Sequence, residues 1–186
     1  MPTPLEEVAD LLAAKGLTIA VAESSAGGYL SHLLTTVPGI SMSFLGGIVA
    51  YGNLAKTTIL KVPEDLLKYE GAVSAQTALS MAAGARVLLN ADIGLSETGI
   101  AGPGGGVASQ SAGDSGKPVG TVYIAIIARD GYQLAERCLW KTNRAGFKNQ
   151  TAEAMLDLAL HYLRRGRSVF TPEGKGSLTP KDIEST

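Results

Sequence analysis

The chain has 186 residues, of which 45% are hydrophobic and 18% are charged, and its formal net charge at pH 7 is -1. This length and composition fit one soluble globular domain, and the balanced charge provides no basic field for nucleic acid or an anionic membrane. The chain cannot form an internal disulfide because Cys138 is its single cysteine. With only His32 and His161 beside it, none of the usual zinc-ligand spacings occurs, so we expect no metal.

No segment has the pattern of an export signal or a membrane anchor. Residues 1–7 lack the basic start and apolar core of a secretory signal, and the longest apolar run of strand type, 122–128, is too short to cross a bilayer. Together with the unpaired cysteine, these features predict a cytoplasmic protein that does not bind membranes.

Hydrophobic periodicity and turn residues predict alternating helices and strands. In chain order they are a helix over 4–15, a strand over 17–22, a helical stretch that opens at 23–28 and ends near 36, a strand over 44–51, a short helix over 54–60 capped by Asn53, a helix over 75–90 capped by Ser74, a strand over 91–96, a hairpin of strands over 121–129 and 132–140 around Asp130-Gly131, and a helix over 144–163.

Two segments are predicted to differ from this packed part. Residues 98–117 form a loop rich in Gly, Ala and Ser that is longer than most connections in compact domains, and we expect 107–116 to be a mobile surface extension. Residues 166–186 are rich in Gly, Ser, Thr, Pro and charge, with almost no apolar periodicity, which predicts a disordered tail. The prediction is one domain over 1–165 followed by this tail.

The first motif with chemical potential is Ala-Glu-Ser-Ser-Ala-Gly-Gly at 22–28. It places Ser24 at the end of a buried strand, where the next backbone amides are unpaired donors that can hold an oxyanion or a phosphate. Serine is also a common helix cap and glycine allows a tight turn, so a purely structural role is the alternative.

The second motif, Tyr-Gly-Asn-Leu-Ala-Lys at 51–56, places Lys56 near the start of a short helix. There the helix dipole disfavours a cation, which predicts a lowered pKa and a neutral amine able to act as a base. Serine needs a neighbouring base to become a nucleophile, and both histidines lie in predicted helices, where packing or surface roles are the expectation. A solvated surface lysine is the alternative.

The third motif is Ser-Glu-Thr-Gly-Ile-Ala-Gly-Pro-Gly-Gly-Gly at 96–106, where a strand runs into glycines. Glycines are expected where the backbone must approach a ligand closely. The pattern is neither a phosphate-binding Walker loop nor a dinucleotide fingerprint before a helix, so alone it is a weak signal.

These strings have the order and spacing of a known family. A-E-S-S-A-G-G, G-G-I-V-A-Y-G-N-x-x-K, G-A-V-S, T-G-I-A-G-P-G-G-G and K-P-V-G-T-V resemble the CinA C-terminal family, which includes nicotinamide-nucleotide amidases, over about residues 5–163. The resemblance implies a single-domain, three-layer α/β/α fold with a mixed β-sheet. It also implies a homo-oligomer that uses a serine-lysine pair, without metal or cofactor, on a small-molecule nucleotide substrate.

Carried over by position, the resemblance implies that Ser24 is the nucleophile, Lys56 the general base and Tyr51 the tyrosine that supports them. Arg144 is expected to contact the substrate phosphate, with a surface residue at a helix start as the alternative. The residues expected to contact the substrate are Ser25, Gly27, Gly28, Thr98, Gly99, Gly102, Gly104, Gly105 and Arg144.

The sequence departs from the family pattern in two motifs. Ser25 and Ala26 stand where the family usually has Cys and Thr, and Ile40 stands where it usually has Ser. The expected activity is deamidation of nicotinamide mononucleotide to nicotinic acid mononucleotide and ammonia. The alternatives are a hydrolase of another small amide, favoured by Ala26 and Ile40, and a non-catalytic nucleotide-binding or regulatory module.

Overall fold

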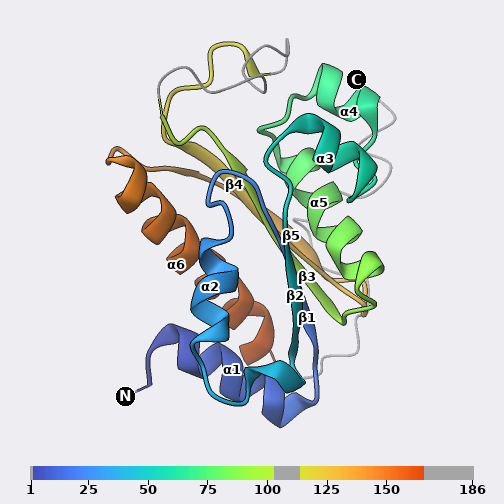
Figure 1. Cartoon of the computed structure of the whole chain (residues 1–186), viewed down its shortest axis with the longest axis vertical. Coiled ribbons are helices and arrows are strands. Elements are labelled where there is room, and N and C mark those ends of the chain that lie inside the picture. The colour runs from blue at the N-terminus through green and yellow to red at the C-terminus, as the bar shows by residue number, and fades with distance from the viewer. Residues whose placement is uncertain (1, 103–113, 166–186) are drawn as a thin grey trace.

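The computed structural model describes residues 2–102 and 114–165 and contains one five-stranded sheet (Figure 1). The strands lie in the order β2-β1-β3-β4-β5. Their bounds are β1 Ile19–Glu23, β2 Phe44–Val49, β3 Ile93–Gly99, β4 Thr121–Ala128 and β5 Gln133–Leu139. Strand β1 is parallel to both β2 and β3, whereas the β3–β4 and β4–β5 pairs are antiparallel. The predicted mixed sheet is confirmed.

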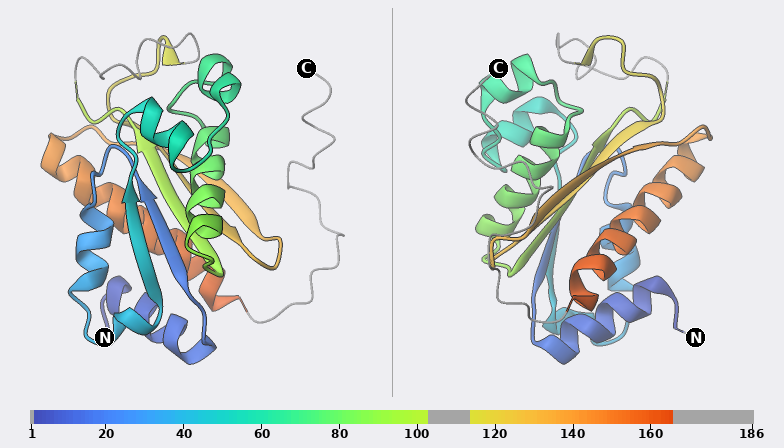
Figure 2. Two further views of the ribbon diagram at one scale, coloured as in Figure 1. Left: turned by 45° about the vertical axis from the view of Figure 1, so that its right-hand side comes forward. Right: turned by 180° about the vertical axis from the view of Figure 1, so that it is seen from behind.

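Helices cover both faces of the sheet, which confirms the predicted three layers (Figures 1 and 2). One face carries α1 (Pro4–Lys15), α2 (Tyr29–Thr35) and α6 (Arg144–Arg164), and the other carries α3 (Asn53–Thr58), α4 (Glu64–Tyr69) and α5 (Ala75–Leu88). All five residues of β1 are buried, as expected for a strand covered on both faces.

Local sequence explains several helix ends. Thr3 caps α1 in a capping box with Glu6, and Gly16 ends the helix in the left-handed conformation at φ 61°. Ser74 accepts a hydrogen bond from the Thr77 amide at the start of α5, and Asn143 does the same for Gly146 in α6. The predicted starts of all three helices are confirmed.

Other boundaries differ from the prediction. The helix α4 and a short 3-10 helix over Ile40–Met42 were not predicted. Residues 24–28 form a turn instead of the first residues of α2, because the two glycines adopt positive φ angles of 65° and 90°. Asn53 is the first residue of α3 and not its cap, since Gly52 occupies the cap position without a side-chain hydrogen bond.

The sheet topology brings the three predicted motifs together. Strands β1, β2 and β3 are mutually parallel, so their carboxyl ends meet at one edge of the sheet. Ser24 follows β1, the segment 50–56 follows β2, and Glu97 to Gly99 end β3. This edge of the sheet therefore carries residues from all three motifs.

Some predictions concern residues outside the described ranges. Gly104, Gly105, the segment 107–113 and the tail 166–186 all lie there. Within the described ranges, no helix is both long and apolar enough to cross a bilayer.

Candidate functional site

Ser24 and Lys56 meet at the carboxyl edge of the sheet. The Lys56 Nζ atom lies 2.8 Å from Ser24 Oγ and donates a hydrogen bond to it. Ser24 is 5% exposed and Lys56 is fully buried. When the amine is neutral, the same separation allows the serine hydroxyl to donate to the amine instead. The two side chains thus have the geometry of a nucleophile and its base.

The environment of Lys56 explains why its amine can be neutral. Burial lowers the pKa of Lys56 to about 8, although the negative charges of Glu97 and Asp114 act in the opposite direction. The helix dipole does not have the role that the sequence suggested, because Lys56 lies in the last turn of the six-residue α3, where a cation is favoured. The pKa of Lys56 is lowered, as predicted, but the cause is desolvation and not the helix dipole.

Two carbonyl groups fix the position of the Lys56 amine. The carbonyl oxygen of Ala50 accepts a hydrogen bond from Nζ at 3.0 Å, and that of Tyr51 accepts one at 3.3 Å. The Tyr51 side chain is 64% exposed. The described contact of Tyr51 with Lys56 is therefore made by its main chain, and the expected supporting role of Tyr51 stays a prediction.

A buried carboxylate, Glu97 of β3, organises the turn that carries Ser24. Its Oε1 atom accepts hydrogen bonds from the main-chain amides of Ser24 and Ala26, the latter at 2.8 Å, and its Oε2 atom accepts one from the Ser25 hydroxyl. Glu97 has no exposed surface, and burial raises its pKa. One of the turn amides expected to stabilise an oxyanion, that of Ala26, is thus already paired.

The amides of Gly27 and Gly28, later in the same turn, are not bound by Glu97. Among the described residues, no group accepts a hydrogen bond from the amides of Gly27 and Gly28. A Cβ atom built on Gly27 would lie 3.4 Å from Lys148 Nζ, so this ammonium group lies over the turn. Free amides beside a cation form an environment that favours an anion. Lys148 was not singled out from the sequence.

Arg144 and the glycines after β3 border the same edge. A Cβ atom on Gly102 would lie 2.8 Å from a terminal nitrogen of the exposed Arg144 side chain, so the guanidinium covers this glycine. A Cβ atom on Gly99 would approach Ser25 Oγ and the Thr121 carbonyl oxygen to 2.9 Å. Gly99 therefore packs closely against its neighbours, whereas at Gly102 the neighbour is the end of a flexible side chain, and the expected contact of these glycines with a ligand stays a prediction.

Thr98 and Asp114 support the segment before α5. The buried Thr98 hydroxyl donates to the Ala72 carbonyl oxygen at 2.6 Å, so its expected contact with a substrate stays a prediction. Asp114 accepts hydrogen bonds from the amides of Ala72 and Val73 at 2.8 and 2.9 Å and from Lys117 at 3.1 Å. Asp114 is 3% exposed, so the prediction of a surface extension is wrong for this residue.

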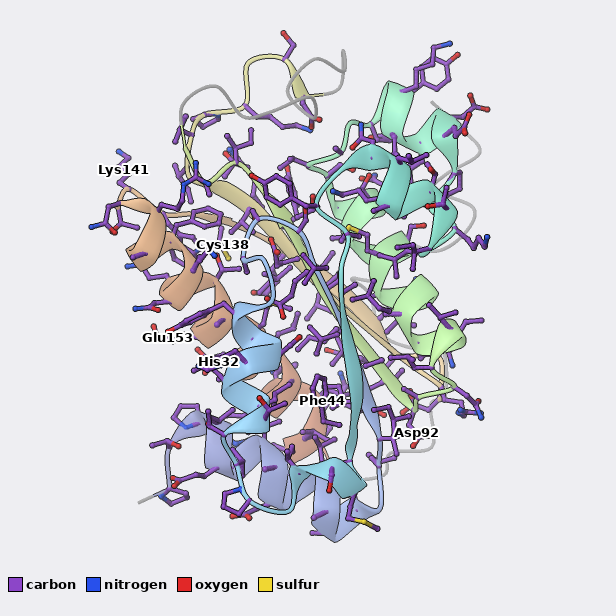
Figure 3. The ribbon with its side chains drawn as sticks, in the orientation of Figure 1. His32, Phe44, Asp92, Cys138, Lys141 and Glu153 are labelled. Atoms are coloured by element: carbon purple, nitrogen blue, oxygen red, sulfur yellow. The ribbon has the colours of Figure 1, made fainter. Side chains whose placement is uncertain are left out.

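The remaining chemically notable side chains lie elsewhere. Figure 3 shows His32 on α2 and Cys138 on β5, and His161 lies in α6. Burial, with a smaller effect of Glu136, raises the pKa of the half-buried Cys138 thiol. No three His, Cys, Asp or Glu side chains in the ranges 2–102 and 114–165 gather in a way that would hold a metal ion.

Comparisons with known proteins point to one family. The family model described as the CinA C-terminal domain matches residues 3–163. A putative competence-damage inducible protein of Desulforudis audaxviator is 44% identical over 163 residues, which are 87% of this chain and 37% of that protein. A CinA-like protein of Geotalea uraniireducens is 45% identical over 150 residues, 81% of this chain and 34% of that protein. The chain thus spans only about a third of these curated relatives.

Solved structures share the fold. The competence/damage inducible protein CihA of Agrobacterium tumefaciens is 36% identical, with a TM-score of 0.75 over 89% of this chain and 98% of that one. The competence damage-inducible protein A of Klebsiella pneumoniae is 28% identical, with a TM-score of 0.80 over 87% of this chain and 96% of that one.

Proposed function

Since the chain belongs to the CinA C-terminal domain family, we propose that it is an amidohydrolase that releases ammonia from the carboxamide of nicotinamide mononucleotide. The observation that carries this proposal is the buried contact of 2.8 Å between Lys56 Nζ and Ser24 Oγ. A serine beside a lysine whose pKa is lowered to about 8 has a base for its proton near neutral pH. The choice of substrate rests on the family resemblance and on the basic side chains near the turn.

The first half of the reaction forms an acyl-enzyme. Ser24 Oγ attacks the carboxamide carbon while its proton passes to the neutral amine of Lys56. The tetrahedral intermediate then collapses, the carbon–nitrogen bond breaks, and the Lys56 ammonium returns a proton to the departing nitrogen. Ammonia leaves, and the nicotinoyl group stays bound to Ser24 as an ester.

The second half restores the enzyme. Lys56 takes a proton from a water molecule that attacks the ester carbon, and the proton then returns to Ser24 Oγ as the ester bond breaks. The product is nicotinic acid mononucleotide, whose new carboxylic acid group releases its proton to the solvent. Because the amides of Ser24 and Ala26 are occupied by Glu97, we assign the oxyanion to the other amides of the turn, those of Ser25, Gly27 and Gly28.

The substrate phosphate is assigned to the basic side chains of α6. Arg144 and Lys148 lie four residues apart, one turn along a helix, and therefore share a face. The Arg144 guanidinium lies over Gly102, and the Lys148 ammonium lies over Gly27 in the turn that carries Ser24. Two cations on one face provide charge-assisted contacts for a phosphate. A neutral amide without a phosphate would not need them.

A panel of amides tests this proposal. Purified protein is incubated with nicotinamide mononucleotide, nicotinamide riboside, nicotinamide and a set of unrelated small amides, and ammonia release is measured. The proposal predicts that kcat/KM is highest for the mononucleotide and at least about 10-fold lower for the riboside, which lacks the phosphate. A preference for an unphosphorylated amide would show a different substrate, and binding of the mononucleotide without turnover would show a regulatory module.

A further inference from the structure

Glu97 is a fully buried carboxyl group that the proposed reaction does not use. Its three described partners are the Ser24 amide, the Ala26 amide and the Ser25 hydroxyl. All three are hydrogen-bond donors, and this is the pattern that satisfies an ionised carboxylate, which only accepts. One side chain of β3 therefore binds Ser24 and the two residues that follow it.

We propose that Glu97 is a positioning residue with two effects: its carboxylate fixes the Ser24 turn, and its negative charge holds a proton on the Lys56 amine. The second effect follows because Glu97 and Lys56 are both fully buried at the carboxyl edge of the sheet, where water does not screen their attraction. Lys56 can accept the proton of Ser24 only when it is neutral. Glu97 thus raises the lowest pH at which the dyad works, against the larger effect of burial, which lowers it.

Other buried charges near the dyad have different contacts. Asp114, from the segment before β4, also acts on Lys56, but its carboxylate is bound to the amides of Ala72 and Val73 and to Lys117. Glu23 of β1 accepts hydrogen bonds from the amides at the start of α2 and raises the pKa of Glu97. Of these three carboxylates, Glu97 is the one with described hydrogen bonds to the Ser24 turn.

Glu97→Gln separates charge from position. The amide oxygen of Gln can accept from the Ser24 and Ala26 amides, and its NH₂ group can donate to Ser25 Oγ, so the turn stays anchored while the charge is removed. Glu23→Gln is the matched control, because it removes an equally buried charge that binds α2. Glu97→Ala removes charge and anchor together, and thermal unfolding shows whether that variant folds.

The direct readout is the titration of Lys56, followed by NMR on protein with ¹³C-labelled lysine ε-carbons and assigned with Lys56→Met. The expected result is that Glu97→Gln moves the Lys56 midpoint down by about one pH unit, because the ammonium form loses a nearby opposite charge, and that Glu23→Gln moves it less. An unchanged or raised midpoint in Glu97→Gln would overturn the charge effect.

The inference rests on the proposed function for its catalytic meaning, but the titration needs no substrate. If the midpoint moves and no amide is hydrolysed, the proposed reaction fails and the electrostatic role stands. In an active protein, the acid limb of kcat/KM should move with the NMR midpoint in Glu97→Gln. A Glu97→Ala variant that folds and keeps the parent's turnover at high pH would overturn the positioning effect.

Discussion

Lys56 shows how a single buried residue depends on its surroundings more than on its position in a helix. Its side chain is fully buried, and its amine contacts Ser24 Oγ and two main-chain carbonyl oxygens. Desolvation disfavours the ammonium form, and the carbonyl oxygens and nearby carboxylates partly offset this effect. The sequence indicated the Ser24–Lys56 pair through its motifs, but burial of the lysine follows from tertiary packing that no local pattern contains.

The proposed base gives a prediction for the pH dependence of activity. The pKa of Lys56 is lowered to about 8, so below this pH the amine is protonated and cannot accept the proton of Ser24. We expect kcat/KM to rise about 10-fold per pH unit up to about pH 8 and then to level off. A profile from pH 6 to 10 checks this. A rate that is flat or falls across this range would contradict a lysine base.

The basic side chains of α6 give a second prediction at this scale. Arg144→Ala and Lys148→Ala should each raise KM for nicotinamide mononucleotide by about 10-fold, because each removes a charge-assisted contact to phosphate. The KM for nicotinamide riboside should change little. Lys141→Ala is the control, since Lys141 is an exposed cation just before α6 (Figure 3). An equal rise in KM for both substrates would exclude a phosphate-specific role.

Some residues near Ser24 and Lys56 could not be predicted from the sequence, because their contacts form only in the folded chain. Glu97 lies 73 positions from Ser24 in the sequence, yet its carboxylate binds the Ser24 amide, and no local spacing predicts such a contact. Asp114 similarly binds the amide of Ala72 across 42 positions. Lys148 is a different case, because its spacing of four residues from Arg144 on a helix was a signal available in the sequence.

At the scale of elements, the position of Lys56 depends on how closely α5 approaches the chain after α3. A Cβ atom on Gly84 of α5 would lie 2.1 Å from the Leu60 carbonyl oxygen, and Leu60 follows α3 by two residues. The contact is with backbone, so it cannot be relieved by rotating a side chain. The glycine therefore allows the helix to pack against the segment that follows Lys56.

Substitution of this glycine gives a stability prediction. Gly84→Ala should destabilise the protein by about 1–3 kcal/mol despite the higher helix propensity of alanine, because the packed backbones must separate. Gly52→Ala is the matched control: its φ is −92° and a Cβ atom there would meet nothing within 4 Å. Chemical denaturation of both variants is the measurement. Equal stabilities for the two variants would show that the close approach is not required.

Element types were largely predictable, whereas the turn at 24–28 was not. Helices α1, α5 and α6 begin at the predicted caps, because capping depends on local hydrogen bonds. The turn differs because Gly27 and Gly28 adopt positive φ angles, which end any helical path before Tyr29 and which the apolar pattern does not reveal. The missed helix α4 starts with acidic residues after Pro63 but has Leu67 as its single buried residue, so it lacks a helical apolar stripe.

At the scale of the whole molecule, the sheet order decides that a site can form. Three parallel strands end at one edge, and each contributes one motif to it. The mixed topology was predictable from the family resemblance and from the hairpin signal, and the alternating helices and strands agree with it. The edge strand β2 carries half-exposed apolar residues such as Leu45 and Val49.

The expected homo-oligomer is a prediction at this scale. The family resemblance implies it, and the half-exposed residues on β2 are compatible with an assembly, since edge strands are usually covered or charged. Sedimentation analysis should give a mass at least twice that of one chain, at concentrations in the micromolar range. A single species with the mass of one chain would contradict this prediction.

Ser24 and Lys56 are proposed to act together as nucleophile and base. The most direct measurement is ammonia release from nicotinamide mononucleotide by the parent protein, by Ser24→Ala, by Lys56→Ala and by the double variant, each shown to be folded. We predict turnover in the parent and a loss of at least about 10³-fold in each single variant, with no further loss in the double variant. Substantial turnover by either single variant would contradict the dyad.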